Sequence, residues 1–206
     1  TAFKEWLVNK PSPGDTVVFY FSGHGSQVVD ESGDEADGWD EILCPADLTP
    51  TVDRQQYLNS ILDDELNALL NQISTDNVTV ILDSCHSGTG TKSLIDAGLT
   101  TPKRIERDLL LAPRKPVNSP TPRQESMSVE PTDEHHVLIS GSKPEEVSLD
   151  ALWESPAGDT FYAGVLTKNL VEGLRRATGE TRYKDLMAPV LQSVRERSSQ
   201  TPQFEG

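Results

Sequence analysis

Two short motifs, one around a histidine and one around a cysteine, carry the residue types most suited to chemistry. His24 lies in Ser22-Gly23-His24-Gly25-Ser26, directly after an apolar run from Thr16 to Phe21. Cys85 lies in Asp83-Ser84-Cys85-His86-Ser87-Gly88, directly after a second apolar run from Val78 to Leu82. Runs of this kind, rich in β-branched residues, predict strands that are buried on both faces of a parallel sheet. Both side chains then lie past the carboxyl end of a strand, where open α/β sheets place their ligands.

A cysteine and a histidine that meet across neighbouring strands can perform nucleophilic catalysis. A thiolate is a far better nucleophile than a thiol, and a nearby imidazole can take the thiol proton and later give it to the leaving amine. The glycines that flank His24 allow a tight turn and leave the imidazole uncrowded. The two motifs together therefore predict a cysteine-dependent hydrolase.

The remaining apolar residues predict the elements that must position these motifs. A helix begins at Asp63, a third strand covers His136–Ser140, and two helices follow that strand. The expected apolar positions of the three helices are Leu66, Leu69, Leu70 and Ile73; Phe161, Val165, Leu170 and Leu174; and Leu186, Val190, Leu191 and Val194. The alternation of strand and helix predicts right-handed crossovers and a layered α/β fold.

Two further stretches are expected to lie outside this pattern. Phe3, Trp6 and Leu7 share one face of a short N-terminal helix. The residues from Ser22 to about Asn59 are polar and acidic, and we expect them to form a loop. The chain begins without a methionine or a signal-peptide pattern, so we expect it to be a fragment of a longer protein.

Charge and composition exclude several classes of protein. The 206 residues include 18 Lys and Arg against 33 Asp and Glu, which gives a formal net charge of −15. Such a surface is unsuited to nucleic acid and fits cationic partners, either basic peptides or metal ions. Two cysteines cannot form a disulfide framework, and no apolar run approaches the length of a membrane span. We therefore expect a cytoplasmic protein that binds neither nucleic acid nor a membrane.

The chain divides into three parts within one domain. Residues 1–92 form a large catalytic part and residues 136–206 form a small part. The segment between them, residues 93–135, holds six of the 14 prolines and several basic clusters. This composition predicts an exposed, partly disordered connector.

The order of these motifs resembles the caspase-like cysteine peptidases, most closely the type I metacaspases and the bacterial orthocaspases. The resemblance covers Asp15 to Gly88 and His136 to Gly206, including the closing stretch Gln200 to Gly206. It implies a three-layer caspase–hemoglobinase-like fold with a mostly parallel central sheet flanked by helices. The family's first strand and helix would precede this segment and are expected to be missing from it.

The resemblance also implies a role for each motif residue. Cys85 would be the nucleophile, His24 the general base and acid, and the backbone amides of Gly25 and Cys85 the oxyanion hole. Ser22 and Asp83 match positions of the pocket that receives the residue before the scissile bond (P1). A carboxylate in that pocket selects Arg or Lys, because a buried charge demands an opposite partner.

Two alternatives to this function stay open at this stage. One is a related caspase-like peptidase with a different P1 preference, and the other is a non-catalytic scaffold that keeps the fold for interaction. The presence of both His24 and Cys85 favours an enzyme over a scaffold.

The resemblance further implies calcium activation. Asp63 and Asp64 match a pair of aspartates that opens a helix, and Asp40 matches a loop position before them. Basic peptides or proteins are the expected substrates, and the resemblance implies a monomer.

Self-processing is expected in the connector, because exposed extended segments are where proteolysis concentrates and the P1 pocket favours a cation. Arg104 and Arg107 are the leading candidate sites, followed by Lys103.

Overall fold

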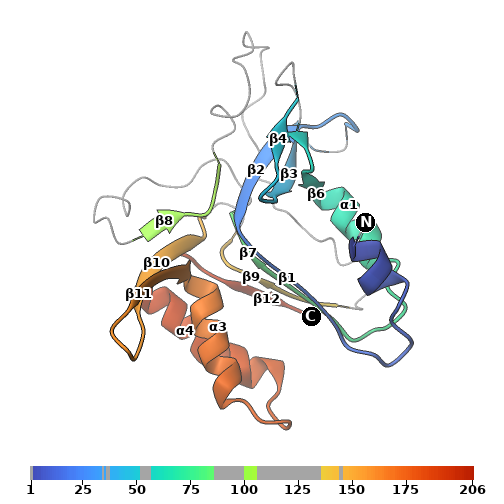
Figure 1. Cartoon of the computed structure of the whole chain (residues 1–206). Coiled ribbons are helices and arrows are strands. Elements are labelled where there is room, and N and C mark those ends of the chain that lie inside the picture. Colours follow the sequence, from blue (N-terminus) through green and yellow to red (C-terminus); the bar gives the residue numbers. More distant parts are fainter. Residues whose placement is uncertain are drawn as a thin grey trace.

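A central four-stranded sheet organises the chain (Figure 1). The computed structural model describes residues 2–33, 35, 38–51, 57–85, 100–105, 136–143 and 146–206. The sheet has the order β1 (Val17–Ser22), β7 (Val78–Asp83), β9 (His136–Ser140) and β12 (Gln203–Glu205). The first three strands are parallel, whereas β12 runs antiparallel to β9. The predicted α/β class is therefore confirmed, and the central sheet, predicted to be mostly parallel, has three parallel strands and one antiparallel strand.

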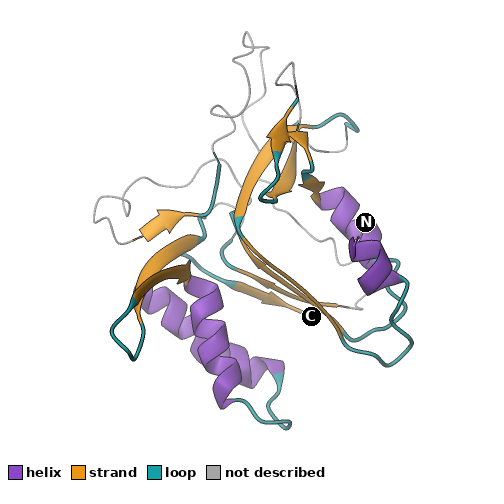
Figure 2. Cartoon of the chain, in the orientation of Figure 1, coloured by secondary structure: helices purple, strands orange, loops and turns teal. Residues whose placement is uncertain are grey.

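Helices cover the two faces of this sheet (Figure 2). The short π-helix η1 (Lys4–Val8) and α1 (Asp63–Leu70) lie on one side, and α3 (Val165–Arg176) and α4 (Tyr183–Arg197) lie on the other. This arrangement of a sheet between two layers of helices is the three-layer α/β architecture that the sequence predicts. Among the described helices, none is long and apolar enough to cross a membrane.

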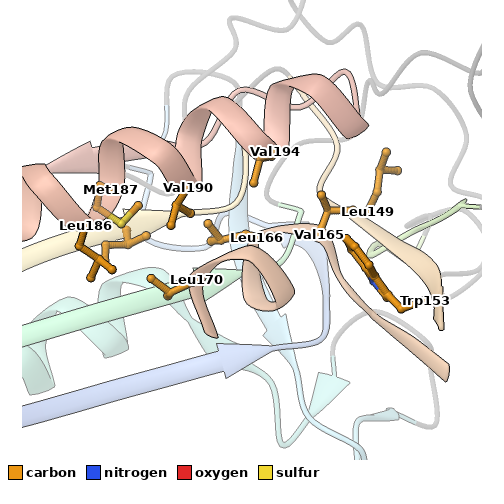
Figure 3. Close-up of a cluster of buried hydrophobic side chains, with 10 residues drawn as sticks. Leu149, Trp153, Val165, Leu166, Leu170, Leu186, Met187, Val190 and Val194 are labelled. Atoms are coloured by element: carbon orange, nitrogen blue, oxygen red, sulfur yellow. The ribbon is translucent and has the colours of Figure 1, made fainter. Parts of the chain in front are cut away.

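Each face of the sheet has its own hydrophobic core, because successive residues of a strand point to opposite faces. On the α1 side, Leu66 packs with Val80 and Leu138. On the other side, Ile139 packs with residues of α3 and α4. Figure 3 shows this second cluster, whose labelled members are Leu149, Trp153, Val165, Leu166, Leu170, Leu186, Met187, Val190 and Val194.

Two smaller antiparallel sheets stand beyond the carboxyl ends of the central strands (Figure 1). One contains β2 (His24–Val29), β3 (Trp39–Cys44) and β6 (Ile61–Leu62). The other contains β8 (Thr100–Pro102), β10 (Leu149–Glu154) and β11 (Thr160–Gly164), while β4 (Thr49–Pro50) pairs with β5 (Tyr57–Leu58). Both three-stranded sheets contribute to the site described below.

The expectation that Ser22 to Asn59 form an acidic loop is wrong for much of this segment. Its residues form β2 and β3, whose inward positions are partly polar and so conceal the usual apolar alternation. Gln27 of β2 is buried because its side-chain amide donates a hydrogen bond of 3.0 Å to the buried carboxylate of Glu41 in β3. A buried polar pair of this kind leaves no hydrophobic signal in the sequence.

Four apolar residues lie in other elements or are more exposed than the sequence predicts. Phe161 belongs to strand β11 instead of the helix that follows it. Trp6 is 62% exposed, with the ammonium of Lys10 lying 3.1 Å from its ring centroid. Strand β1 is not buried on both faces, because Tyr20, like Val18, is about half exposed.

Candidate active site

The histidine and cysteine motifs meet where β1 and β7 end. These strands are in parallel register, with Ser22 beside Asp83. The backbone N–H of Gly23 donates to the carbonyl oxygen of Asp83 over 3.3 Å, which ties the two strand ends together. His24, the first residue of β2, is exposed, whereas Cys85 is only 1% exposed.

A segment of the chain itself occupies this junction. Residues Thr100–Pro102 form β8, which pairs antiparallel with β10. The backbone N–H of Lys103 continues this pairing and donates to the carbonyl oxygen of Ser148 over 2.9 Å. On the other side, the N–H of Ile105 donates to the carbonyl oxygen of Gly25 over 3.0 Å. The segment thus lies extended between β10 and β2, as a bound peptide would.

The carbonyl oxygen of Lys103 accepts two converging hydrogen bonds. The donors are the backbone N–H groups of Gly25, at 3.1 Å, and Cys85, at 3.3 Å. These are the two amides expected to form an oxyanion hole. A pair of fixed donors aimed at one carbonyl oxygen can stabilise negative charge that develops there.

The ammonium group of Lys103 is buried among four oxygen atoms. Its Nζ donates to Ser22 Oγ over 2.6 Å and to the Asp83 carbonyl oxygen over 3.0 Å, and lies 3.1 Å from Asp83 Oδ2. Asp150 Oδ1 lies 3.4 Å away. Lys103 is 2% exposed and Asp83 is fully buried, so each charge depends on the other for compensation.

This pocket contains the predicted Ser22 and Asp83 together with Asp150, which the sequence reasoning missed. Asp150 lies in β10, directly opposite Thr101 of β8. It has no motif around it, and only the pairing of these two strands brings its carboxylate to the pocket.

Two glycines allow neighbouring groups of the site to lie closer to the backbone than a side chain would permit. A Cβ atom on Gly25 would overlap the carbonyl oxygen of Cys85. A Cβ atom on Gly164, at the start of α3, would overlap both the Asp83 carboxylate and the Lys103 ammonium. Only a residue without a side chain fits at these positions without displacing the backbone of Cys85 or the side chains of the pocket.

The thiol of Cys85 is protonated at neutral pH in this arrangement. Burial raises its pKa to about 12, against the smaller lowering effect of its hydrogen bond to Ser148 and of nearby positive charges. In the described part of the chain, Cys85 Sγ donates to the Ser148 carbonyl oxygen over 3.1 Å instead of bonding to His24. The structure thus places the predicted pair past the carboxyl ends of β1 and β7, with the segment around Lys103 hydrogen-bonded to the backbone of Cys85.

The carboxylates expected to bind calcium are only partly brought together. The cluster that could hold one ion joins Asp63 to Glu35 and Glu41, whose ligand oxygens lie within 4.8 Å of one another. Asp40 and Asp64 do not belong to it. Asp40 and Glu41 are neighbours in β3 and so point to opposite faces, which sequence reasoning missed because it placed both in a loop.

The connector differs from its expected character where the structure describes it. Lys103 is buried in the pocket instead of exposed. Arg104 lies beside Gly25 through an isolated parallel bridge. Arg107 falls outside the described residues, as do most of residues 93–135.

Comparison with known proteins agrees with the sequence motifs. Residues 1–93 match the family model "Metacaspase, peptidase C14 domain". Metacaspase-1B of Aspergillus niger is 26% identical over 97% of this chain and 49% of its own length. Metacaspase-2 of Arabidopsis thaliana is 43% identical, but over 43% of this chain and 20% of its own length. The chain thus spans half or less of these two relatives.

A solved structure supports the fold. The crystal structure of a Geobacter sulfurreducens protein superposes with a TM-score of 0.60. The match covers 99% of this chain and 70% of the other, at 24% sequence identity.

The buried thiol predicts a pH dependence of stability. The unfolded chain loses the Cys85 proton above its ordinary pKa of 9.0, whereas the folded chain keeps it until about pH 12. Stability must therefore fall as the pH rises through this window, by about 1.4 kcal/mol per pH unit from this one group. Urea unfolding of wild type and Cys85→Ala between pH 8 and pH 10.5 measures the difference. If the free energies of unfolding of the two proteins change equally with pH, the thiol is not buried as described.

Proposed function

From the premise that this chain is a metacaspase-like protein of the caspase family, we propose that it is a cysteine endopeptidase that cleaves after Lys or Arg. The observation that carries the proposal is Lys103. Its ammonium lies against Asp83 and Ser22, and its carbonyl oxygen accepts hydrogen bonds from Gly25 and Cys85. A P1 residue ready for cleavage has both of these features.

The proposed reaction is acyl transfer through Cys85. The imidazole of His24 takes the thiol proton, and the thiolate attacks the P1 carbonyl carbon. The negative charge that develops on the carbonyl oxygen is stabilised by the Gly25 and Cys85 amides, and one such donor is typically worth about 3 kcal/mol. His24 then protonates the leaving amine, and water hydrolyses the thioester.

Specificity for a basic P1 residue follows from the charges in the pocket. A buried carboxylate without a counter-ion is costly, so Asp83 favours a cation. Asp150 adds a second carboxylate at the pocket mouth, where it is 34% exposed. Lys is accommodated as observed, and a guanidinium suits the same carboxylates.

Self-processing at the Lys103–Arg104 bond is part of this proposal. The segment already occupies the site in the extended conformation of a substrate, which favours Lys103 over Arg104 and Arg107 as the P1 residue. The thiol must leave its bond to the Ser148 carbonyl before it can attack, so the described arrangement precedes the reaction.

The two free cysteines provide a matched test of the mechanism. Cys85→Ala should abolish cleavage of Arg and Lys peptides, because it removes the nucleophile. Cys44→Ala, which removes the other buried thiol, should retain at least about half of the wild-type kcat/KM. Fluorogenic peptides with Arg, Lys and Asn at P1 give the rates. Turnover by Cys85→Ala, or a preference for Asn, would refute the proposed function.

The processing site is tested by neighbouring substitutions. Lys103→Ala should prevent cleavage at this bond, whereas Arg104→Ala should retain it, since only Lys103 fills the pocket. The carboxyl-terminal fragment of the wild type, residues 104–206, should begin at Arg104. Gel electrophoresis and N-terminal sequencing provide the measurement. If the fragment begins at another residue and the Lys103–Arg104 bond is intact, this bond is not the processing site.

We also propose that calcium binds at the cluster of Glu35, Glu41 and Asp63. Calcium prefers several carboxylate oxygens, and three acids this close repel one another without a cation. The observation that supports the proposal is the 4.8 Å grouping of their oxygens, two of the residues being buried. This set replaces Asp40 and Asp64 of the sequence expectation and keeps Asp63.

Asp63 and Asp64 offer a matched pair to test this site. Calcium should raise the melting temperature of the wild type and of Asp64→Asn, whose side chain is outside the cluster. The increase should be lost in Asp63→Asn. Thermal unfolding in calcium and in excess chelator gives the result. Equal calcium stabilisation of both variants would exclude this donor set.

A further inference from the structure

We propose that Thr167 is a positioning residue that holds the Asp83 carboxylate in the orientation that recognises the P1 cation. The inference rests on the proposed function, because it concerns the same pocket. It adds a residue of α3 that neither motif includes.

Both polar groups of Thr167 bind the same oxygen atom of Asp83. The backbone N–H donates to Asp83 Oδ2 over 2.9 Å, and Thr167 Oγ1 donates to the same atom over 2.5 Å. This oxygen is also the one that lies 3.1 Å from the ammonium of Lys103. Asp83 Oδ1 is buried without a hydrogen-bond partner among the described residues. Thr167 therefore determines which oxygen of Asp83 meets the cation.

The start of α3 is built to receive this carboxylate. Helix α3 begins after Gly164, which has no side chain to cap the helix, and its first turn contains no acidic residue. The free amide of Thr167 is capped instead by Asp83, which comes from the neighbouring strand β7. A negative charge at this end is favoured by the helix dipole as well as by the hydrogen bond. The missing side chain of Gly164 leaves the space that the carboxylate fills.

Tyr20 fixes the direction of the hydroxyl group of Thr167. A threonine hydroxyl has one proton, and here it is donated to Asp83. The Tyr20 hydroxyl, 2.9 Å from Thr167 Oγ1, must therefore donate to Thr167. Tyr20 lies in β1, two residues before Ser22, which also binds the ammonium of Lys103. The hydrogen bond between these two hydroxyl groups thus connects β1, the strand that contains Ser22, to α3, the helix that binds the Asp83 carboxylate.

Removing the hydroxyl of Thr167 should impair recognition of a basic P1 residue without affecting the nucleophile. Thr167→Val preserves the shape of the side chain and the backbone N–H, and Thr167→Ser preserves the hydroxyl. For Arg and Lys peptides, Thr167→Val should lower kcat/KM at least about tenfold, mainly through KM, since a hydrogen bond to a charged group is lost. Thr167→Ser should remain within about threefold of the wild type.

Two readouts separate positioning from a general structural effect. Alkylation of Cys85 by iodoacetamide in a Cys44→Ala background, and the slow cleavage of a matched peptide with Gln at P1, should both change less than about twofold in Thr167→Val. A matched control is Tyr183→Phe, which removes a hydroxyl that lies 2.6 Å from Thr79 Oγ1, away from the pocket. It should leave the preference for Arg and Lys over Gln unchanged.

The outcomes distinguish the inference from the proposed function. If the wild type cleaves no Arg or Lys peptide, the proposed function itself fails. If the wild type cleaves them and Thr167→Val does so equally well, the positioning role is overturned. The positioning role is also overturned if Thr167→Val lowers kcat/KM equally for basic and Gln peptides and slows alkylation of Cys85 as much, because such a uniform loss indicates a general structural role. If Thr167→Val does not fold, Tyr20→Phe provides the test, with an expected two- to fivefold loss of kcat/KM on basic peptides alone (about 0.5–1 kcal/mol).

Discussion

The buried pairing of a Lys103 ammonium with the Asp83 carboxylate is the interaction on which the rest of the site depends. Neither charge is stable in a protein interior alone, and each has its remaining bonding capacity partly met by neutral groups. Ser22 and the Asp83 carbonyl surround the cation, while Thr167 binds the anion. The pocket is thus assembled from β1, β7, α3 and, through Asp150, β10, which meet past the carboxyl ends of the central strands.

The same pairing sets the position of the peptide backbone around it. With its ammonium held, Lys103 presents its carbonyl oxygen to the amides of Gly25 and Cys85. Its N–H meets the Ser148 carbonyl, which also accepts the thiol proton of Cys85. The Ser148 carbonyl oxygen therefore accepts hydrogen bonds from both the Lys103 backbone and the Cys85 thiol, and the thiol keeps its proton in this arrangement.

The sequence allowed the three parallel strands of the central sheet and the helices α1, α3 and α4 to be predicted from their apolar residues, whereas the antiparallel strand β12 was not predicted. Strands β2 and β3 were missed, since the buried Gln27 and Glu41 break the apolar alternation. Ser22 and Asp83 could be located because they are adjacent to the His24 and Cys85 motifs. Asp150 and Thr167 could not, because only the pairing of β8 with β10 and the docking of α3 bring them to the pocket.

In the proposed reaction, the antiparallel pairing of β8 with β10 would affect how soon the site is vacated after self-processing. Cleavage after Lys103 would leave residues 100–103 hydrogen-bonded to β10, with the new carboxylate at the two backbone amides. A product that remains attached to the same folded unit competes with incoming substrate at an effective concentration in the millimolar range. The rate at which this strand peels away from β10, rather than bond cleavage itself, would then limit how soon the site becomes open to another polypeptide.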